Sequence, residues 1–466
     1  MYSVTQNICA ALHLGRLIPQ EVIDRLEDRH RANLPEFGID KATVLLEAKC
    51  ARVRDEIFDL ILLIPAFWIV LTILNFDFHN TDSFLLRAIL TFSPPIFLAA
   101  LIETIKVLVI NNHLRRKVAR SITHAEQPED GSSVHNVIIF GGFSPFAGYG
   151  VDLDGWSFVI DSEKPKNDDD RTHQFEQIEL LNCVSEVIRK TLISATITDK
   201  IFVDGRRIRS NRMLLPAITA SPKVWIDPDV IRAKIGQPDQ EALHYRVISI
   251  QLADEQMLLT YFLRSTMLGS NLFIESRCFL LPPIKPEFAE LVNLPCWHGP
   301  QYYCRVYAQK LLGSLLILLG GSIFLLGIVR RSRIWLSERI FGHPEDKRKV
   351  RDESYNYGNP KSLRESWGAE NWNAYFQMLE KDMAAKTCQY VIVNSIVDFL
   401  DAKGIATDDI KERRTQIFNS GLIISGGTVT AEQVAVGSGA SVKTKITVPQ
   451  SAESDGGQHG QRRHHS

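Results

Sequence analysis

Two apolar runs near the N-terminus constrain the fold of this chain more than any other feature. The first, Ile57 to Phe76, contains one charged residue, Asp59, and at ~1.5 Å per residue it covers the ~30 Å hydrocarbon core of a bilayer. The second, Phe84 to Ile110, is longer than one span and contains Ser93-Pro94-Pro95. We therefore expect two transmembrane helices within residues 56–110, with the excess length taken up by tilt or by a kink at the prolines.

Basic residues flank this helical pair on both sides. They are Lys49, Arg52 and Arg54 before it and Arg115, Arg116, Lys117 and Arg120 after it, whereas the polar loop between the runs has none. Lys and Arg near the ends of spans accumulate on the cytoplasmic side of a membrane. The pattern predicts a multi-pass protein of the cell inner (cytoplasmic) membrane, with the lipid bilayer as its partner and a helical N-terminal region, residues 1–55, in the cytoplasm.

Glu103 and Lys106 are charged residues inside the second run, spaced so that they share one helix face. Two interpretations fit them: an intramembrane functional pair, or a mark of the cytoplasmic interface. Because charge buried in lipid is rare, we favour the interface.

A third apolar run, Leu311 to Val329, is free of charge and long enough to cross a bilayer. Lys310 and Arg330 are among the basic residues on its two sides, so the charge rule gives it no orientation. Gly320-Gly321 at its centre is compatible with a re-entrant segment, whereas the cost of exposing irregular backbone to lipid favours a plain span. We expect residues 311–329 to be a third transmembrane or re-entrant segment, followed by a charged connector, residues 330–360.

The composition of the whole chain resembles that of a soluble protein, with 45% apolar residues and a net charge of -1, so the lipid-facing part is a small, concentrated fraction. Neutralising nucleic-acid phosphates needs an excess of Lys and Arg on one face, so we expect no nucleic-acid partner. The seven cysteines are scattered and include no CxxC pair, which favours a reducing compartment.

After a linker, residues 111–133, the pattern of residues 134–295 predicts an α+β domain. A succession of strands without alternating βαβ units favours this class over a doubly wound sheet. Asp204-Gly205 is a strong two-residue hairpin signal because both residues tolerate positive φ. The other expected elements are strands at Val137–Phe140, Trp156–Ile160, Tyr245–Leu252, Met257–Arg264 and Asn271–Leu281, and a helix at Gln174–Ser194.

The loop GGFSPFAGYG follows the first of these strands and is the strongest candidate for a ligand site. A glycine-rich turn after a strand can present backbone N–H groups to a phosphate. Its spacing matches neither GxGxxG nor GxxxxGK[ST], and glycine-rich loops are more often turns that need positive φ. The candidate ligand-binding residues are Gly141, Gly142, Ser144, Gly148 and Gly150.

This loop, the stretch SNLFIESRCFLLPPI and the C-terminal motifs NSGLIISGG and VAVGSGA resemble a group of bacterial membrane proteins that is common in actinobacteria. The resemblance covers about residues 135 to 445. It implies a bacterial inner-membrane origin and no particular activity, so it assigns no catalytic residue.

Residues 361–448 predict a C-terminal helical unit with a glycine-rich β segment. Trp372 to Leu400 carries an apolar stripe, and residues 420–448 alternate small and β-branched residues in short pieces. One chain supplies few rungs of a β-solenoid, so we expect a homo-oligomer through residues 420–448. The alternative is that this segment packs on its own helices at 372–418. The tail, residues 449–466, is too polar to bury a core, and we expect it to be disordered.

Catalytic motifs are scarce in the sequence. It contains no HExxH and no GxSxG, and the one Cys/His cluster, Cys296, His298 and Cys304, lacks a fourth metal ligand nearby. We therefore predict no metal site and leave the catalytic residues and cofactors unassigned. The sequence favours a membrane-anchored sensor, scaffold or effector with cytoplasmic ligand- or partner-binding domains. The alternative is a membrane-bound enzyme or nucleotide-binding protein that uses residues 141–150 on a phosphorylated ligand.

Overall fold

The computed structural model describes residues 4–13, 17–75, 84–121, 135–166, 172–236, 242–253, 256–288, 300–311, 313, 350–370, 374–412 and 414. All of them belong to the first of two compact units, Met1–Ile423. The third apolar run beyond its first residues, the glycine-rich segment 420–448 and the tail 449–466 lie outside the described part of the chain.

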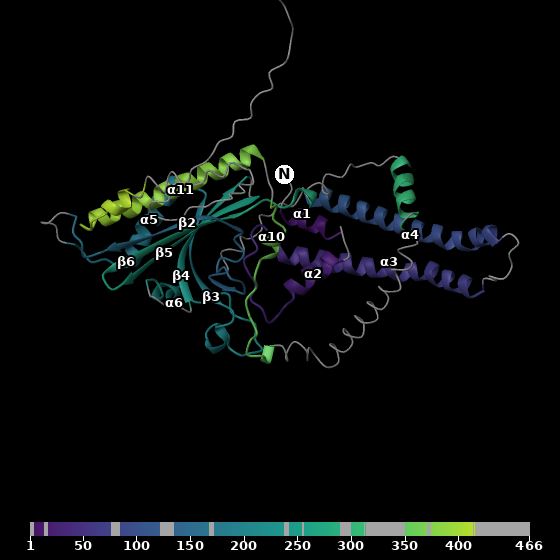
Figure 1. Ribbon diagram of the computed structural model, residues 1–466, viewed down its shortest axis with the longest axis horizontal. Coiled ribbons are helices and arrows are strands. Elements are labelled where there is room, and N and C mark those ends of the chain that lie inside the picture. Colours follow the sequence, from purple (N-terminus) through teal and green to yellow (C-terminus); the bar gives the residue numbers. More distant parts are fainter. Residues whose placement is uncertain are drawn as a thin grey trace, which may run out of the picture. The chain divides into compact units, whose positions relative to one another are not determined.

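A six-stranded sheet forms the core of the α+β domain (Figure 1). Its strands lie in the order β1-β3-β4-β5-β6-β2, with β1 and β3 parallel and every other neighbouring pair antiparallel. The predicted α+β class and the meander of the last three strands are confirmed. The strands are β1 Val137–Phe140, β2 Val151–Asp161, β3 Ala195–Asp204, β4 Ala242–Leu252, β5 Met257–Leu268 and β6 Asn271–Leu281.

Two local predictions for the sheet are wrong. β2 begins at Val151 rather than at Trp156, because it is an edge strand that tolerates exposed Asp152 and Asp154. The hairpin expected at Asp204-Gly205 does not form: β3 ends there and the chain enters the short 3-10 helix η1, Ile208–Ser210. Gly205 instead allows the backbone of residue 358 to approach closely, since a Cβ on residue 205 would lie 2.2 Å from the backbone nitrogen of Gly358.

Helices α5, Gln177–Thr191, and α11, Tyr375–Ala402, cover one face of the sheet (Figure 1). A reciprocal capping box between Glu176 and Glu179 begins α5. Ile392, Ile396 and Leu400 of α11 are buried against the sheet at helical spacing. The long helix expected at 372–400 is therefore part of the same hydrophobic core as the sheet.

The opposite face carries a second core of aromatic and aliphatic side chains. Leu34 and Phe37 reach it from the N-terminal region, and Phe146 and Tyr149 reach it from the loop between β1 and β2. At the β1–β3 end, a third cluster joins η1 and the short helix α6, Pro228–Ala233, to the sheet. Residues before the apolar runs thus complete the core of the domain that follows them.

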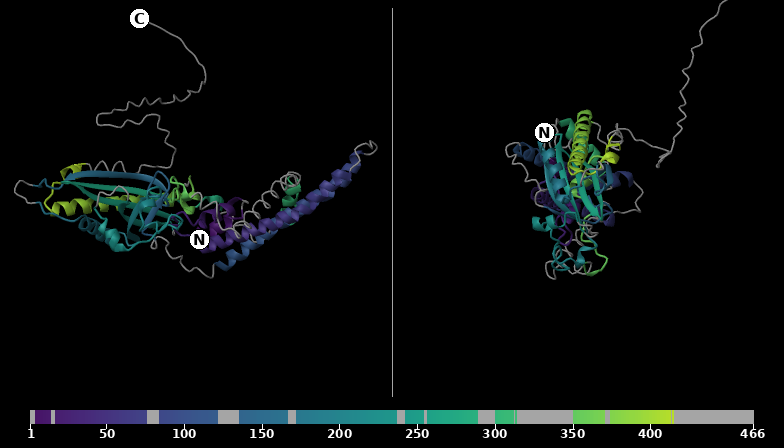
Figure 2. Two further views of the ribbon diagram at one scale, coloured as in Figure 1. Left: turned by 90° about the horizontal axis from the view of Figure 1, so that it is seen from below. Right: turned by 90° about the vertical axis from the view of Figure 1, so that its left-hand side faces the viewer.

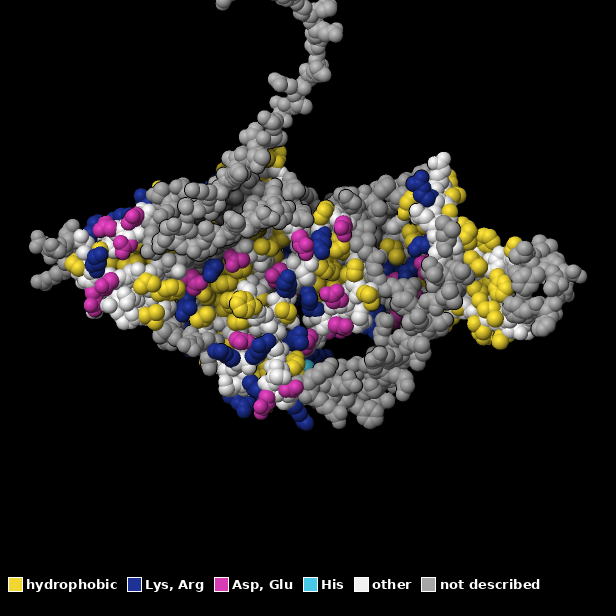
Figure 3. Space-filling model, viewed as in Figure 1, with side chains coloured by type: hydrophobic (Ala, Val, Ile, Leu, Met, Phe, Trp, Pro, Cys, Tyr) yellow, Lys and Arg dark blue, Asp and Glu magenta, His cyan; other side chains and the backbone are white. Residues whose placement is uncertain are grey.

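The N-terminal region forms α1, Val4–Ala11, and α2, Leu17–Leu26, and leads into two long antiparallel helices, α3, Lys41–Asn75, and α4, Phe84–Ser121 (Figure 2). Both continue through their prolines. Leu62, Ala99 and Ile102 pack between them, whereas large apolar side chains such as Ile64 and Phe67 are exposed. Figure 3 shows apolar side chains gathered along this hairpin. Among the described residues these are the two helices long and apolar enough to cross a membrane.

The C-terminal part of the second apolar run pairs with the start of α3. Lys106 Nζ lies 3.2 Å from Asp55 Oδ1, just before Ile57. The part of α4 beyond Lys106 therefore runs beside the polar start of α3. Glu103 contacts Lys310 at 3.7 Å, so Glu103 and Lys106 each have an ion-pair partner on another segment.

Candidate functional site

The predicted ligand-binding residues lie together in the loop that joins β1 to β2. Gly148 and Gly150 have φ of +96° and +91°, the region that favours glycine. Gly141 and Gly150 also allow close approach: a Cβ would lie 2.4 Å from Gly358 O and 2.2 Å from Leu280 O, respectively. Gly142 has ordinary space, with its nearest neighbour at 3.7 Å.

Several amides of this loop donate to acceptors within the protein. Gly141 N donates to Asn359 O at 3.0 Å, and Gly148 N donates to a carboxylate oxygen of Glu365 at 2.9 Å. Burial raises the pKa of Glu365, although the bond from Gly148 opposes this shift. The side chain of Glu365 thus holds the place beside Gly148 that an anionic ligand would need.

The aromatic residues of the loop close the second core. Phe146 packs on Phe262 and Phe279 with ring centroids 4.3 Å and 4.9 Å apart, and Tyr149 is fully buried. Phe143, in contrast, is fully exposed. The glycines therefore allow the loop to turn tightly enough to place two aromatic side chains in the sheet's core.

A buried polar junction lies next to the loop, around the short helix α10, Leu363–Ser366. Glu36, from the N-terminal region, accepts hydrogen bonds from Leu363 N at 2.8 Å and Arg364 N at 2.9 Å. Arg364 donates to Gln256 O and Pro282 O, at 2.7 Å and 2.5 Å. Burial raises the pKa of Glu36 and lowers that of Arg364 to about 10. Three distant parts of the chain meet here.

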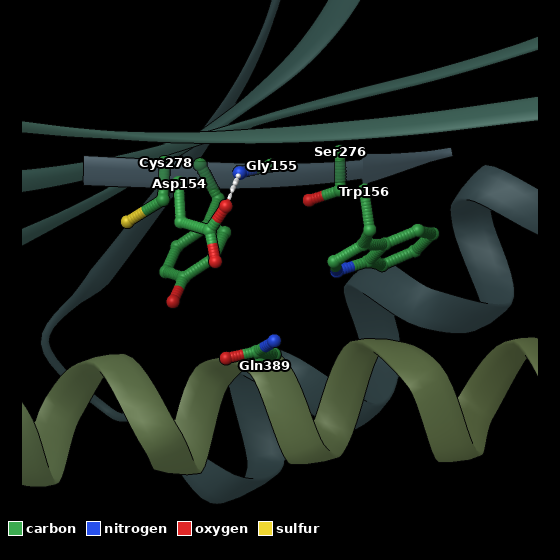
Figure 4. A pocket seen from close by; sticks show the side chains of 7 residues that line it. Asp154, Gly155, Trp156, Ser276, Cys278 and Gln389 are labelled. Atoms are coloured by element: carbon green, nitrogen blue, oxygen red, sulfur yellow. Dashed lines mark hydrogen bonds between the residues drawn. The ribbon is translucent and has the colours of Figure 1, made fainter. Parts of the chain in front are cut away.

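A small polar cleft lies between the sheet and α11 (Figure 4). Gln389 of α11 faces side chains from β2 and β6 across it. The cleft has a volume of about 10 Å³, room for roughly one water molecule. Its lining residues are Asp154, Gly155, Trp156, Tyr261, Ser276, Cys278 and Gln389.

Two groups of this cleft, the Cys278 thiol and the Tyr261 hydroxyl, are kept protonated. Burial raises the pKa of the Cys278 thiol to about 12 and raises the pKa of Tyr261, whose hydroxyl donates to Ala385 O at 2.8 Å. A thiol with this pKa is a poor nucleophile. The geometry thus provides hydrogen bonds between the sheet and α11, and it supplies no activated nucleophile.

An ion pair between neighbouring strands, with Arg246 buried and Asp199 partly buried, is joined to α5 by hydrogen bonds. Asp199 accepts from Arg246 Nε at 2.7 Å and from His244 Nε2 at 2.9 Å. Arg246 also donates to Asn182 and to Ser185 on α5, at 3.0 Å and 2.8 Å. Burial tends to raise the pKa of Asp199, but the bond from His244 and the charge of Arg246 outweigh it and the pKa is lowered. Each charge has a partner, as a structural network requires.

These features define a class: an α+β domain closed by its own glycine-rich loop and joined to a helical hairpin apolar enough to cross a membrane. The chain belongs to the AbeC-like domain family, whose model matches residues 155–430, more than half of its length. The match begins inside β2, after the hairpin and the glycine-rich loop. The comparisons with curated proteins and with solved structures found no match.

Proposed function

We propose that this chain is a membrane-anchored sensor or scaffold, in which the α+β domain faces the cytoplasm of a bacterial cell and the hairpin holds it at the inner membrane. A ligand or partner that binds the domain then changes the packing at the base of the hairpin, where Glu47 of α3 contacts His113 of α4. The resemblance to actinobacterial membrane proteins and the basic flanks of the hairpin support the location.

The observation that carries the proposal is the continuity between the hairpin and the domain. Residues 32–39 lead directly into α3, yet Phe37 packs on Tyr149 with centroids 5.2 Å apart and Glu36 caps α10. Lys41, the first residue of α3, donates to Leu34 O at 3.3 Å. A flexible tether would leave these residues in solvent, whereas here they form part of the core. We therefore propose that a displacement of the domain is transmitted through them to α3.

Hydrogen exchange of the full chain in detergent micelles tests this continuity. Phe37→Ala removes a core contact, so we expect faster amide exchange in residues 141–150 and also in the first turns of α3. Phe143→Ala is the matched control, because that ring is fully exposed and its loss should change neither segment. Faster exchange limited to residues 34–39 would contradict transmission.

Nucleotide binding at residues 141–150 is the alternative, and the amide contacts of Gly141 and Gly148 argue against it. We expect nucleotides with Mg²⁺ to leave the melting temperature of the full chain unchanged. A rise in melting temperature that disappears in Gly142→Val would favour the nucleotide-binding function instead.

We also propose that the chain forms a homo-oligomer through residues 420–448, on the ground of their solenoid-like sequence. Membrane anchoring raises the local concentration of such segments. The mass of the detergent-extracted protein, measured with and without residues 420–466, tests this. Two forms that are both monomeric would refute it.

A further inference from the structure

Three side chains from separate helical segments converge at the base of the hairpin. His13 follows α1, Glu47 lies on α3 and His113 lies on α4. The Nε2 atoms of His13 and His113 lie 2.9 Å and 2.8 Å from the same oxygen, Glu47 Oε1. The Glu47 side chain is fully buried and that of His13 nearly so, whereas 41% of the His113 side chain is exposed. The cluster is thus built into the packing and is accessible from one side.

Although the sequence alone predicts no metal site, we propose that His13, Glu47 and His113 form a binding site for a divalent transition-metal ion of the Zn²⁺ type. Two imidazoles and one carboxylate are the ligand set that zinc and its first-row neighbours use when three protein ligands leave one position open. Mg²⁺ and Ca²⁺ prefer oxygen ligands, so the two imidazoles disfavour them. The three ligand atoms lie within 4.8 Å of one another, close enough to surround one ion after small side-chain movements.

The position of the site relative to the apolar runs favours access from water. Glu47 precedes Ile57 by ten residues, which is ~15 Å along a helix, and His113 follows the last residue of the second run, Ile110. The site therefore lies outside the hydrocarbon core. An ion there would join α1 to both helices of the hairpin.

Arg54 opposes the metal in the geometry of this structure. Its Nη1 contacts His13 Nδ1, and its Nη2 lies 3.0 Å from Asp55 Oδ1. A metal on Nε2 requires the proton of His13 on Nδ1, where Arg54 cannot then donate. Metal binding thus requires Arg54 to move away from His13 Nδ1, although it can keep its ion pair with Asp55. It follows that Arg54→Gln should bind Zn²⁺ more tightly than the unmodified chain.

The test uses the full chain in detergent, with the tail histidines His459, His464 and His465 replaced by Ala to remove their background binding. Zinc content is measured after equilibrium dialysis, and melting temperature with Zn²⁺, Mg²⁺ or a chelator. We expect about one tightly bound Zn²⁺ per chain and a melting temperature raised by Zn²⁺ but not by Mg²⁺.

The ligand variants are Glu47→Gln, His13→Ala and His113→Ala, and His173→Ala serves as the control because His173 is exposed and far from the cluster in sequence. Each ligand variant should weaken Zn²⁺ binding by more than ~10-fold, while the control binds as before. Glu47→Gln keeps a hydrogen-bond acceptor, so it guards against a loss caused by misfolding.

A merely hydrogen-bonded cluster makes a different prediction. In that case Zn²⁺ would not bind at one ion per chain, and it would not change the melting temperature of the chain that keeps the cluster intact. Either of these two negative results overturns the proposal, whatever the ligand variants show. Undiminished binding in all three ligand variants would place the ion elsewhere and overturn it as well.

Discussion

Gly141 and Gly142 are neighbours in the sequence that differ in what a methyl group would meet. A Cβ at residue 141 would lie 2.4 Å from the backbone oxygen of Gly358, whereas at residue 142 the nearest atom is 3.7 Å away. Gly141→Ala should therefore lower the free energy of unfolding by roughly 1–3 kcal/mol, the range for an overpacked site. Gly142→Ala should change it by less than about 0.5 kcal/mol. Denaturant unfolding of the two variants measures this, and equal effects would contradict the packing account.

Asp199 gives the domain a specific dependence on pH. Its folded-state pKa lies below the ordinary 3.8, so its contribution to stability is fully present above pH 3.8 and is lost as the pH falls through the folded pKa. Asp199→Asn should cost about 3 kcal/mol at pH 7, because it leaves Arg246 buried without a counter-charge.

The same measurement at several pH values separates this effect from a general loss of packing. The stability difference between the unmodified chain and Asp199→Asn should narrow below pH 3.8. Asp229→Asn is the control, since the ion pair of Asp229 with Arg232 is exposed and should contribute little. A difference that stays constant with pH would show that the charge of Asp199 is not the cause.

At the scale of the elements, sequence periodicity located the long helices and most strands, but not the short helices α6 and α10 and not the packing partners of α5 and α11. The alternation in residues 245–281 predicts the β4-β5-β6 meander because each strand meets its sequence neighbour. The apolar stripe of α11 predicts a helix, but an apolar stripe does not indicate which surface covers it. The hairpin predicted at Asp204-Gly205 does not form, because the close packing of Gly205 on the backbone of Gly358 overrides the local turn propensity.

The packing of α11 on the sheet can be tested with two nearby residues. Ile392 is fully buried, whereas 57% of Tyr390 is exposed. Ile392→Ala should lower the free energy of unfolding by about 2–5 kcal/mol through loss of buried area and a residual cavity. Tyr390→Ala should have little effect. Similar small effects at both positions, measured by urea unfolding, would mean that α11 is not part of the core.

For the whole molecule, the contacts that sequence analysis missed are those between distant segments. The chain separates Glu36 from Arg364, and His13 from His113, by stretches that include apolar runs, so no local spacing reveals either pair. The glycine-rich loop was found from its composition, yet its contacts with residues 356–365 depend on a segment far along the chain. A fragment limited to residues 134–295 would lack α10, α11 and Phe37, and we expect it not to fold stably.

A measurement of the chain's orientation in the membrane tests the central claim, that the α+β domain faces the cytoplasm, most directly. Cys50 and residue 354 are both exposed, one at the base of the hairpin and one in the domain. The test uses two chains that each contain a single cysteine: one keeps only Cys50, and the other carries only the cysteine introduced by Ser354→Cys. Each is treated with a membrane-impermeant thiol reagent. We predict labelling of both in inverted inner-membrane vesicles and of neither in intact cells. Labelling of residue 354 in intact cells would contradict the cytoplasmic placement of the domain and, with it, the proposed function.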